Sequence, residues 1–283
     1  MILVTGDSGF IGKWITFTLR TDEGEIAVGY DIEDGLDIRD KFSLYKVFNE
    51  HNIDTVIHLA ARAGVRTSKY FPDEYISTNI QGTKNVLDVA EMFGVKHVIF
   101  FSSSSVYGSQ TPPNSESQPL NPESLYAITK ATGEMLCQAS PVPTTVIRPF
   151  TVYGLHGRND QVIYKWLNQI KAGKPITVFG DGTTKRGYTH VQDLVEGVIK
   201  VWKSGAPQSG HEVYNLGGDE VIELRQLIEI FKESKEITIE NRDLPQGDVV
   251  ENWADISKAK KALHWEPVRH FKDEVLNIIT NNS

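Results

Sequence analysis

The sequence predicts an α/β protein with a doubly wound parallel sheet, followed by a smaller C-terminal α/β domain. In the first half of the chain, short apolar runs rich in branched residues alternate with longer helical patterns. Strands that are apolar throughout are typical of a parallel sheet covered by helices on both faces. After residue 150 the texture changes to strand-like and helical runs that end in a mixed tail.

The elements of the first half follow from this pattern. Strands are predicted at residues 1–5, 25–30, 54–59, 96–102 and 144–148. Helices are predicted between them at 9–20, 72–93 and 123–138. Pro72 suits the first turn of the second helix, where its missing N–H costs nothing. The segment 109–122 is dense in turn-forming residues and predicts a surface loop.

The second half predicts fewer elements. Strand-like runs occur at 176–182 and 212–218, and helical patterns at 191–203 and 222–233. We therefore expect one domain over residues 1–150 and a second domain over 151–283.

Composition excludes several classes of protein. The 283 residues carry a net charge of −8, which argues against a broad nucleic-acid surface. A single cysteine, Cys137, excludes an internal disulfide and a cysteine-cluster metal site, and no metal is predicted. No run approaches the roughly 18 apolar residues of a membrane span. Because the chain begins with a strand, "MILVTG", we expect no signal peptide and a cytoplasmic protein.

A glycine-rich segment lies between the first strand and the first helix. "VTGDSGFIG" places Gly6, Gly9 and Gly12 where the backbone must turn tightly and approach a pyrophosphate at a helix N-terminus. The strand before it and the helix after it favour a dinucleotide site on a Rossmann-type domain. A plain structural turn is the alternative.

Asp31 ends the second strand, 19 residues after Gly12. A carboxylate there accepts hydrogen bonds from the adenosine ribose and repels a 2′-phosphate, which favours NAD over NADP. A solvated aspartate at a strand end is the alternative. His58 lies among apolar residues without a local partner, so we interpret it as a core histidine rather than a ligand.

"YAITK" places Tyr126 and Lys130 four residues apart on one helix, and therefore on one face. An ammonium beside a phenol favours the phenolate and lowers its pKa from about 10. The tyrosine then becomes a candidate general base toward a substrate hydroxyl.

With these motifs in place, the sequence resembles the extended short-chain dehydrogenase/reductases that modify nucleotide-sugars, and most closely the UDP-glucuronate 4-epimerases among them. The resemblance covers nearly the whole chain. It rests on "TGDSGFIG", "DIRD" (37–40), "HLAA" (58–61), "NIQGT" (79–83), "SSSSVYG", "YAITK", "RPFTVYG" (148–154), "KRGYTHVQD" (185–193) and "GDVVENWADISKAKKAL" (247–263).

The resemblance implies NAD as cofactor and a set of residues that bind it. Asp37 and Ile38 would contact adenine, and Phe150 would lie at the nicotinamide end. The full set of implied cofactor-binding residues is Gly6, Gly9, Phe10, Ile11, Gly12, Asp31, Ile32, Asp37, Ile38, Leu59, Ala60, Ala61, Asn79, Tyr126, Lys130 and Phe150.

The resemblance also implies catalytic and substrate-binding roles. Ser103 matches the hydroxyl residue that hydrogen-bonds the sugar O4, Tyr126 matches the base, and Lys130 tunes it and binds the nicotinamide ribose. Arg186 and Asp248 match residues that hold the nucleotide of a UDP-sugar. The implied substrate-binding residues are Arg66, Ser103, Ser104, Ser105, Tyr126, Thr151, Arg158, Arg186 and Asp248.

The residues after Ser103 narrow the reaction. Relatives that eliminate water carry Asp–Glu there, and decarboxylases carry a glutamate in the same loop, because a proton must move at C5 or C6. Here the two positions are Ser104 and Ser105, and a hydroxyl does not readily perform that step. Simple 4-epimerisation through a 4-keto sugar is left.

The sugar is argued from a few positions. "AARAGVRTS" (60–68) is close to the pattern of UDP-glucuronate 4-epimerases, which usually have Gln where Arg62 stands, and Thr151 and Arg158 also match that group. Hydroxyls of Ser104, Ser105 and Thr151 would be donors to a C6 carboxylate, with a cation nearby. A UDP-glucose 4-epimerase is the alternative, and these hydroxyls would then merely satisfy backbone groups.

Two features depart from the family pattern. Gly187 stands where an acid usually steadies the preceding arginine, and the proline near Asp248 is displaced by one position. Both concern the binding of the substrate phosphates rather than the catalytic residues.

The resemblance implies that the domain over 151–283 binds the nucleotide-sugar and that segments near 187–216 fold back onto the first domain. It also implies a homodimer formed through helices 72–93 and 123–138. Two other functions stay open: a non-catalytic NAD-binding regulator, and a net reductase that consumes NADH. The presence of both Tyr126 and Lys130 argues against the regulator, and a reductase would need an exchangeable cofactor.

Overall fold

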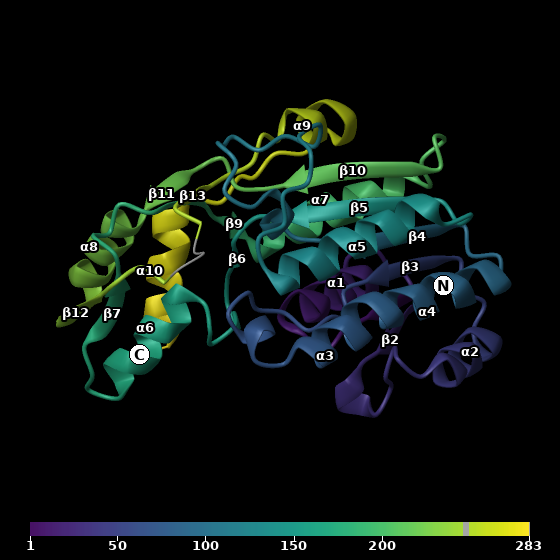
Figure 1. The fold of residues 1–283 in the computed structure, drawn as a ribbon, viewed down its shortest axis with the longest axis horizontal. Coiled ribbons are helices and arrows are strands. Elements are labelled where there is room, and N and C mark those ends of the chain that lie inside the picture. Colours follow the sequence, from purple (N-terminus) through teal and green to yellow (C-terminus); the bar gives the residue numbers. More distant parts are fainter. Residues whose placement is uncertain (246–248, 283) are drawn as a thin grey trace.

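The computed structural model describes residues 1–245 and 249–282, and a parallel sheet of six strands forms its centre (Figure 1). The strands follow the order β10-β5-β4-β3-β1-β2. Their bounds are β1 Ile2–Thr5, β2 Ala27–Tyr30, β3 Thr55–His58, β4 His97–Phe101, β5 Thr144–Pro149 and β10 His211–Leu216. Every neighbouring pair is parallel, which confirms the predicted fold class.

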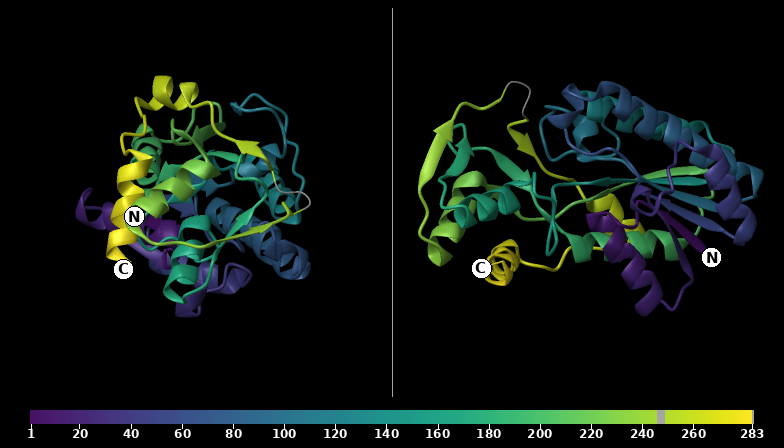
Figure 2. Two further views of the ribbon diagram at one scale, coloured as in Figure 1. Left: turned by 90° about the vertical axis from the view of Figure 1, so that its left-hand side faces the viewer. Right: turned by 90° about the horizontal axis from the view of Figure 1, so that it is seen from below.

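Helices cover both faces of the sheet, as the right-hand view of Figure 2 shows. One face packs against α1 (Phe10–Thr21) and α7 (Val191–Ser204). The other packs against α2 (Lys41–Glu50), α4 (Thr83–Met92) and α5 (Leu125–Ala139). In β1, Ile2 and Val4 enter the first core and Leu3 enters the second, so the strand is apolar on both sides. This double burial is the reason for the continuous apolar strands of the sequence.

The helix predicted over 72–93 is not uniform. It begins as α3 (Pro72–Ile76), continues as the π-helical segment η3 (Ser77–Gly82) and only then becomes α4. The wider π turn changes which side chains face the sheet, and it buries Asn79.

Short helical turns connect the larger elements. They are η1 (Ile32–Asp34) after β2, η2 (Thr67–Lys69) before α3, and η4 (Ser104–Tyr107) after β4. Both η1 and η4 follow the carboxyl end of a strand, and ligands bind at this edge in open α/β sheets.

The C-terminal lobe lies to one side of the large sheet, on the left in Figure 1. Its helices α6 (Val162–Lys171), α8 (Leu224–Ser234) and α10 (Phe271–Asn281) enclose a separate core. Small sheets complete it: β7 (Ile176–Phe179) with β12 (Ile239–Arg242); β8 (Lys185–Gly187) with β11 (Val221–Glu223) and β13 (Glu251–Asn252); and β6 (Val152–Tyr153) with β9 (Thr189–His190). Helix α9 (Ser257–Leu263) packs back on α7 and β10.

Two histidines are buried in the large sheet. His58 lies between the hydroxyls of Thr5 and Thr83, and His97 bonds the hydroxyl of Thr145. Burial lowers the pKa of His58 to about 3 and that of His97 to about 4. His58 is thus a satisfied core residue, and Cys137 is buried in the same core.

These histidines predict acid sensitivity. Below pH 6.5 the two imidazoles become protonated in the unfolded chain. In the folded protein they stay neutral to lower pH, because their pKa values are depressed. The free energy of unfolding should therefore decrease as the pH is lowered from about 6 to 4, by about 1.4 kcal/mol per pH unit for each histidine. Urea unfolding across this range should show a smaller slope, by about that amount, in His97→Gln; an unchanged slope would contradict the assignment.

No helix within residues 1–245 and 249–282 is long and apolar enough to cross a membrane.

Candidate active site

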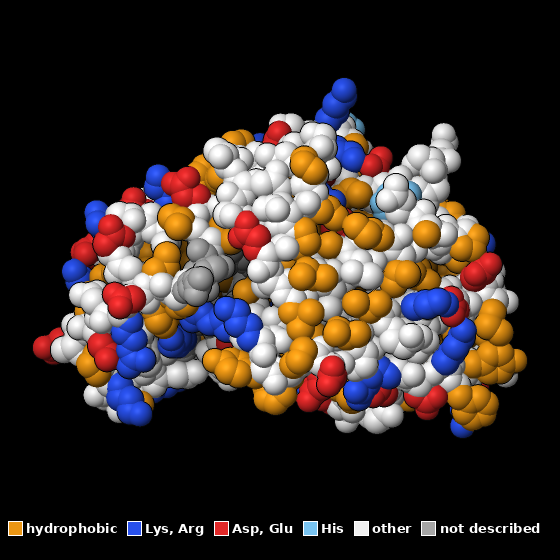
Figure 3. All heavy atoms as spheres, in the orientation of Figure 1, with side chains coloured by type: hydrophobic (Ala, Val, Ile, Leu, Met, Phe, Trp, Pro, Cys, Tyr) orange, Lys and Arg blue, Asp and Glu red, His pale blue; other side chains and the backbone are white. Residues whose placement is uncertain are grey.

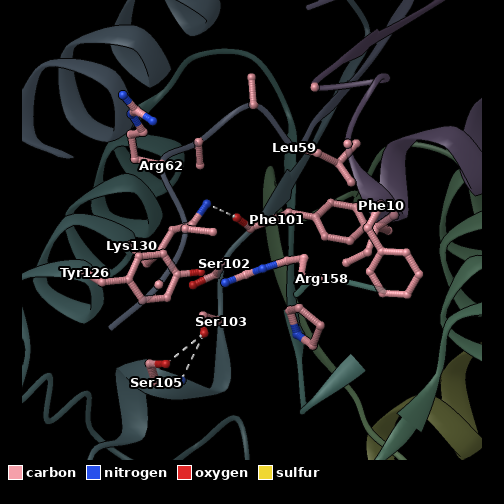
Figure 4. A pocket seen from close by; sticks show the side chains of 18 of the residues that line it. Phe10, Leu59, Arg62, Phe101, Ser102, Ser103, Ser105, Tyr126, Lys130 and Arg158 are labelled. Atoms are coloured by element: carbon pink, nitrogen blue, oxygen red, sulfur yellow. Dashed lines mark hydrogen bonds between the residues drawn. The ribbon is translucent and has the colours of Figure 1, made fainter. Parts of the chain in front are cut away.

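A cavity of about 740 Å³ lies at the carboxyl ends of the parallel strands, between the large sheet and the C-terminal lobe. Ligand cavities in proteins commonly measure about 300–1,000 Å³. The glycine-rich loop, the serine loop, Tyr126, Arg158 and Arg186 all line it. Figure 4 shows the middle of this cavity.

The glycine-rich loop is a cradle that side chains would fill. Gly6 has a left-handed φ of 75°, and a Cβ there would collide with the backbone of Ala60. A Cβ on Gly12 would collide with the carbonyl of Gly6. Helix α1 begins directly after Gly9, and no side chain caps it. Its first N–H groups are therefore left for an anion, which fits the pyrophosphate of a dinucleotide.

The adenosine end of the cavity follows β2. Asp31 accepts hydrogen bonds from the backbone N–H of Ser8 (3.1 Å) and Glu33 (3.0 Å), so its carboxylate is fixed beside the glycine loop. Asp37 pairs with Arg39, which lowers the pKa of that carboxyl. The remaining predicted cofactor residues that line the cavity are Phe10, Ile11, Ile32, Ile38, Leu59, Ala60 and Ala61.

Tyr126, Ser103 and Lys130 meet in the middle of the cavity (Figure 4). The Ser103 hydroxyl lies beside the Tyr126 phenol. The Ser103 hydroxyl also donates to Ser105 Oγ (3.0 Å) and accepts from the Ser105 N–H (3.1 Å). Lys130 is buried one helical turn from Tyr126, and its Nζ donates to the Phe101 carbonyl (2.7 Å).

The electrostatics of the tyrosine differ from the expectation. Burial raises the pKa of Tyr126, and the groups that oppose this are the Ser103 hydrogen bond and the charge of Arg158. Lys130 is not the group that acidifies the phenol, because its ammonium is turned to the end of β4. Burial also lowers the pKa of Lys130 to about 8, so the amine is still mostly protonated at neutral pH.

Arg158 and Arg186 both line the cavity. Arg158 extends toward Tyr126 (Figure 4) and forms an ion pair with Asp160, and Thr151 also lines the cavity. Arg186 donates to the backbone carbonyls of Lys185, Val249 and Val250. Backbone carbonyls thus steady this arginine where Gly187 stands in place of the usual acid. Gly187 itself is required, since a Cβ there would collide with Trp253.

Residues 2–217 match the NAD dependent epimerase/dehydratase family. The chain belongs to this family. It is 38% identical to a UDP-glucuronate 4-epimerase of Thermodesulfobacterium geofontis, over 94% of this chain and 90% of that protein. It is 29% identical to a UDP-glucose 4-epimerase of Bacillus subtilis, over 96% and 94%.

Solved structures give the same family. A crystal structure of the UDP-glucuronic acid 4-epimerase of Bacillus cereus, in complex with UDP-glucuronic acid and NAD, superposes with a TM-score of 0.90. The two chains are 31% identical, and the match covers 100% of this chain and 99% of that one. NAD is therefore the cofactor of this family member, and the glycine cradle fits it.

Three of the family-implied residues are not among those that line the main cavity, and a fourth falls outside the part of the chain that the structure describes. The Asn79 side chain is buried and bonds the backbone of Arg62 and the Thr129 hydroxyl, so it braces the loop after β3 instead of lining the cavity. Phe150 is fully buried and stacks on Tyr107. Arg66 lies over the Phe179 ring and lines a second, smaller cavity of about 220 Å³ that adjoins the first. Asp248 lies outside the described residues.

Three further residues line the main cavity without a signal in the sequence. Glu123, directly after the 109–122 loop, accepts hydrogen bonds from the Ser109 N–H and the Asn121 amide. Gln161 lines the wall between the two cavities. Asn252, from the C-terminal tail, donates to Ser104 Oγ (3.1 Å). Only the neighbouring "GDV" and "ADISK" motifs hint that this tail returns to the site.

Behind the serine loop lies a buried ion pair. Arg148 of β5 makes two hydrogen bonds to Glu134 of α5, at 3.0 and 2.6 Å, and one to the Tyr107 hydroxyl at 2.8 Å. Ser102 donates to the same glutamate. The pair thereby anchors both ends of η4 to the sheet and to the helix that carries Tyr126.

Within residues 1–245 and 249–282, no group of three His, Cys, Asp or Glu side chains is arranged to hold a metal ion.

Proposed function

We propose that this protein is an NAD-dependent 4-epimerase of UDP-hexoses and that it interconverts UDP-glucuronate and UDP-galacturonate. One observation supports the reaction most strongly. The Tyr126 phenol lies beside Ser103 in the cavity that also holds the glycine cradle, and the two residues after Ser103 carry no carboxyl group. The site thus has a base for an alcohol but no acid at the serine loop for dehydration or decarboxylation.

The side chains divide the work as follows. Ser103 holds the sugar O4 by a hydrogen bond, and Tyr126 takes its proton while the alcohol is oxidised. NAD, when bound, would supply the acceptor and later the donor of the C4 hydride. Tyr126 must be a phenolate before it can take the proton, and Arg158 stabilises that negative charge, because its own charge opposes the rise in the Tyr126 pKa that burial causes. The 4-keto sugar then rotates in the cavity and presents its other face to the cofactor. After the hydride has returned to C4, Tyr126 returns the proton to O4.

The choice of sugar rests on three residues that line the cavity. Arg158, Thr151 and Ser104 together offer a cation and two hydroxyl donors to a C6 carboxylate. Charge-assisted hydrogen bonds of this kind contribute about 1.5–3 kcal/mol each. We assign the nucleotide to the end of the cavity near Arg186, with Arg66 facing the adjoining cavity.

Separate incubations with UDP-glucuronate and UDP-glucose, followed by proton NMR, test this proposal. We expect UDP-galacturonate to form from the first sugar. Formation of UDP-galactose alone would establish the alternative, a UDP-glucose 4-epimerase, which the similarity to the Bacillus subtilis enzyme favours. No product from either would contradict the proposed function.

The same experiment separates the remaining rivals. An epimerase regenerates its cofactor, so turnover should proceed without added NADH and leave the absorbance of free NADH unchanged. Stoichiometric loss of added NADH would establish a net reductase. Binding of NAD without turnover of either sugar would favour a regulator.

We further propose that the protein forms a homodimer through α3, α4 and α5. Figure 3 shows apolar side chains gathered over these helices on one face of the molecule. Ile128 and Met135 of α5 are 46% and 59% exposed, and Ile76 and Met92 are exposed at the two ends of the α3–α4 run. Burial of such a face is favourable at about 25 cal/mol per Å².

Sedimentation at micromolar concentration should give about twice the mass of one chain, 31.7 kDa. A single species of that monomer mass would remove this proposal.

Two expectations stay predictions. One is the division into an NAD-binding domain over 1–150, with 187–216 folded back onto it, and a nucleotide-sugar-binding domain over 151–283; limited proteolysis tests it. The other is the cytoplasmic location, which cell fractionation tests.

A further inference from the structure

Two hydrogen bonds connect the C-terminal tail to the serine loop. Asn114 Nδ2 donates to Asn252 Oδ1 (3.1 Å), and Asn252 Nδ2 donates to Ser104 Oγ (3.1 Å). All three side chains are buried: Asn114 is 0% exposed, Asn252 9% and Ser104 7%. The three residues come from the 109–122 loop, from β13 and from η4, so tertiary folding alone brings them together.

The backbone of Asn114 is held on both sides, since its N–H donates to the Trp253 carbonyl (2.9 Å) and its carbonyl accepts from the Asp255 N–H (2.8 Å). The side-chain amides give the chain of bonds its direction: Asn114 Nδ2 is the donor and Asn252 Oδ1 the acceptor, while Asn114 Oδ1 has no hydrogen-bond partner among the described residues. Because Asn252 accepts from Asn114 through its oxygen, its amide nitrogen must face Ser104. An amide nitrogen is only a donor, so Ser104 Oγ is the acceptor of that bond.

The hydroxyl hydrogen of Ser104 therefore points away from Asn252. Ser104 and Asn252 both line the main cavity, and no described residue accepts from this hydroxyl. With its oxygen engaged by Asn252, Ser104 is presented to the cavity as a donor. A carboxylate is only an acceptor, and its bond to such a donor is charge-assisted, whereas a hydroxymethyl group makes a neutral bond of about half the strength.

We propose that Asn252 is a specificity-determining residue, which fixes Ser104 as a donor toward C6 of the bound hexose and so favours a C6 carboxylate over a hydroxymethyl group. This inference rests on the proposed function, because it takes the sugar to lie with C6 beside Ser104. Asn252 acts through Ser104 and need not touch the sugar itself.

The first test is Asn252→Leu, which removes the amide donor at similar volume and adds no charge. The Ser104 hydroxyl is then no longer held as a donor toward the sugar. We expect kcat/KM for UDP-glucuronate to fall about 10- to 100-fold, while that for UDP-glucose changes less than about threefold. Asn252→Asp should give a larger change in the same direction, since its carboxylate accepts the Ser104 hydroxyl.

A double-mutant cycle locates the effect. Ser104→Ala should shift the ratio of the two kcat/KM values to the same degree, and adding Asn252→Leu to Ser104→Ala should shift it no further. Independent, additive shifts would overturn the proposal, because Asn252 would then act on the sugar by another route.

Asn215→Asp is the matched control. Asn215 is fully buried and donates to the carbonyls of Asn114 and Asp255, so it supports the same loop and tail without contacting Ser104. We expect this variant to lower both activities in equal proportion and to leave their ratio within about twofold of the wild type. If Asn252→Leu lowered kcat/KM equally for both sugars, Asn252 would have only a structural role, like Asn215, and the proposal would be overturned.

Calorimetric dissociation constants for the two sugars, measured on NAD-loaded protein, separate this inference from the proposed function. Binding of both sugars without epimerisation would contradict the proposed function. The effect of Asn252→Leu on the ratio of the two dissociation constants would still decide the role of Asn252: a selective loss for UDP-glucuronate supports it, and an unchanged ratio overturns it. Binding of neither sugar would overturn both.

Discussion

Replacing Tyr126 with phenylalanine should lower kcat for the proposed epimerisation by about 10²- to 10⁴-fold. The Tyr126 phenol lines the cavity beside Ser103, and its loss removes the proposed acceptor of the O4 proton. Lys130 cannot replace it, because its ammonium is bound to the Phe101 carbonyl. Proton NMR of the sugar anomeric signals over hours to days would measure the residual rate.

Tyr75→Phe is the control for this substitution. The Tyr75 ring lies 6.3 Å from that of Tyr126, but its hydroxyl donates to the backbone carbonyls of Ala63 and Gly64 rather than facing the cavity. We expect a loss below about tenfold. Both variants should retain NAD, which separates a chemical defect from a folding defect. A Tyr126→Phe rate within tenfold of the wild type would exclude Tyr126 as the base.

The parts of this protein that the sequence predicts well are those encoded by local spacing. The glycine cradle lies within one strand–helix turn, and Tyr126 and Lys130 lie within one turn of α5. In both cases the backbone geometry of a single element brings the residues together. The apolar strands likewise report burial on both faces, which gives the parallel sheet and its helical layers.

The parts that it does not predict depend on contacts between distant segments. Asn252 reaches Ser104 only because β13 pairs with β8 beside the serine loop. Asn79 lies within a π-helical segment, which no residue pattern in the sequence predicts. Its side chain bonds the Arg62 backbone. The pKa of Tyr126 was expected to fall through Lys130, but helical spacing fixes only which face a side chain shares, not which acceptor its charged end selects.

The buried pair between Arg148 and Glu134 gives the largest expected effect on stability. Replacing Arg148 with methionine leaves the Glu134 carboxylate without its cation in the core, and the Tyr107 hydroxyl loses a donor. Breaking such a pair from one side costs about 3–5 kcal/mol of unfolding free energy, because a buried charge is left uncompensated. Urea unfolding followed by circular dichroism would measure the loss.

Two further variants show whether burial is the cause. The double replacement Arg148→Met with Glu134→Leu removes both charges and should recover most of the lost stability, since no ion is left in the core. Lys84→Met breaks the exposed pair with Asp88 and should cost less than about 1 kcal/mol. If Arg148→Met were as mild as Lys84→Met, the pair would contribute no more than a surface ion pair. The serine loop would then be held by the packing of Tyr107 on Phe150 rather than by charge.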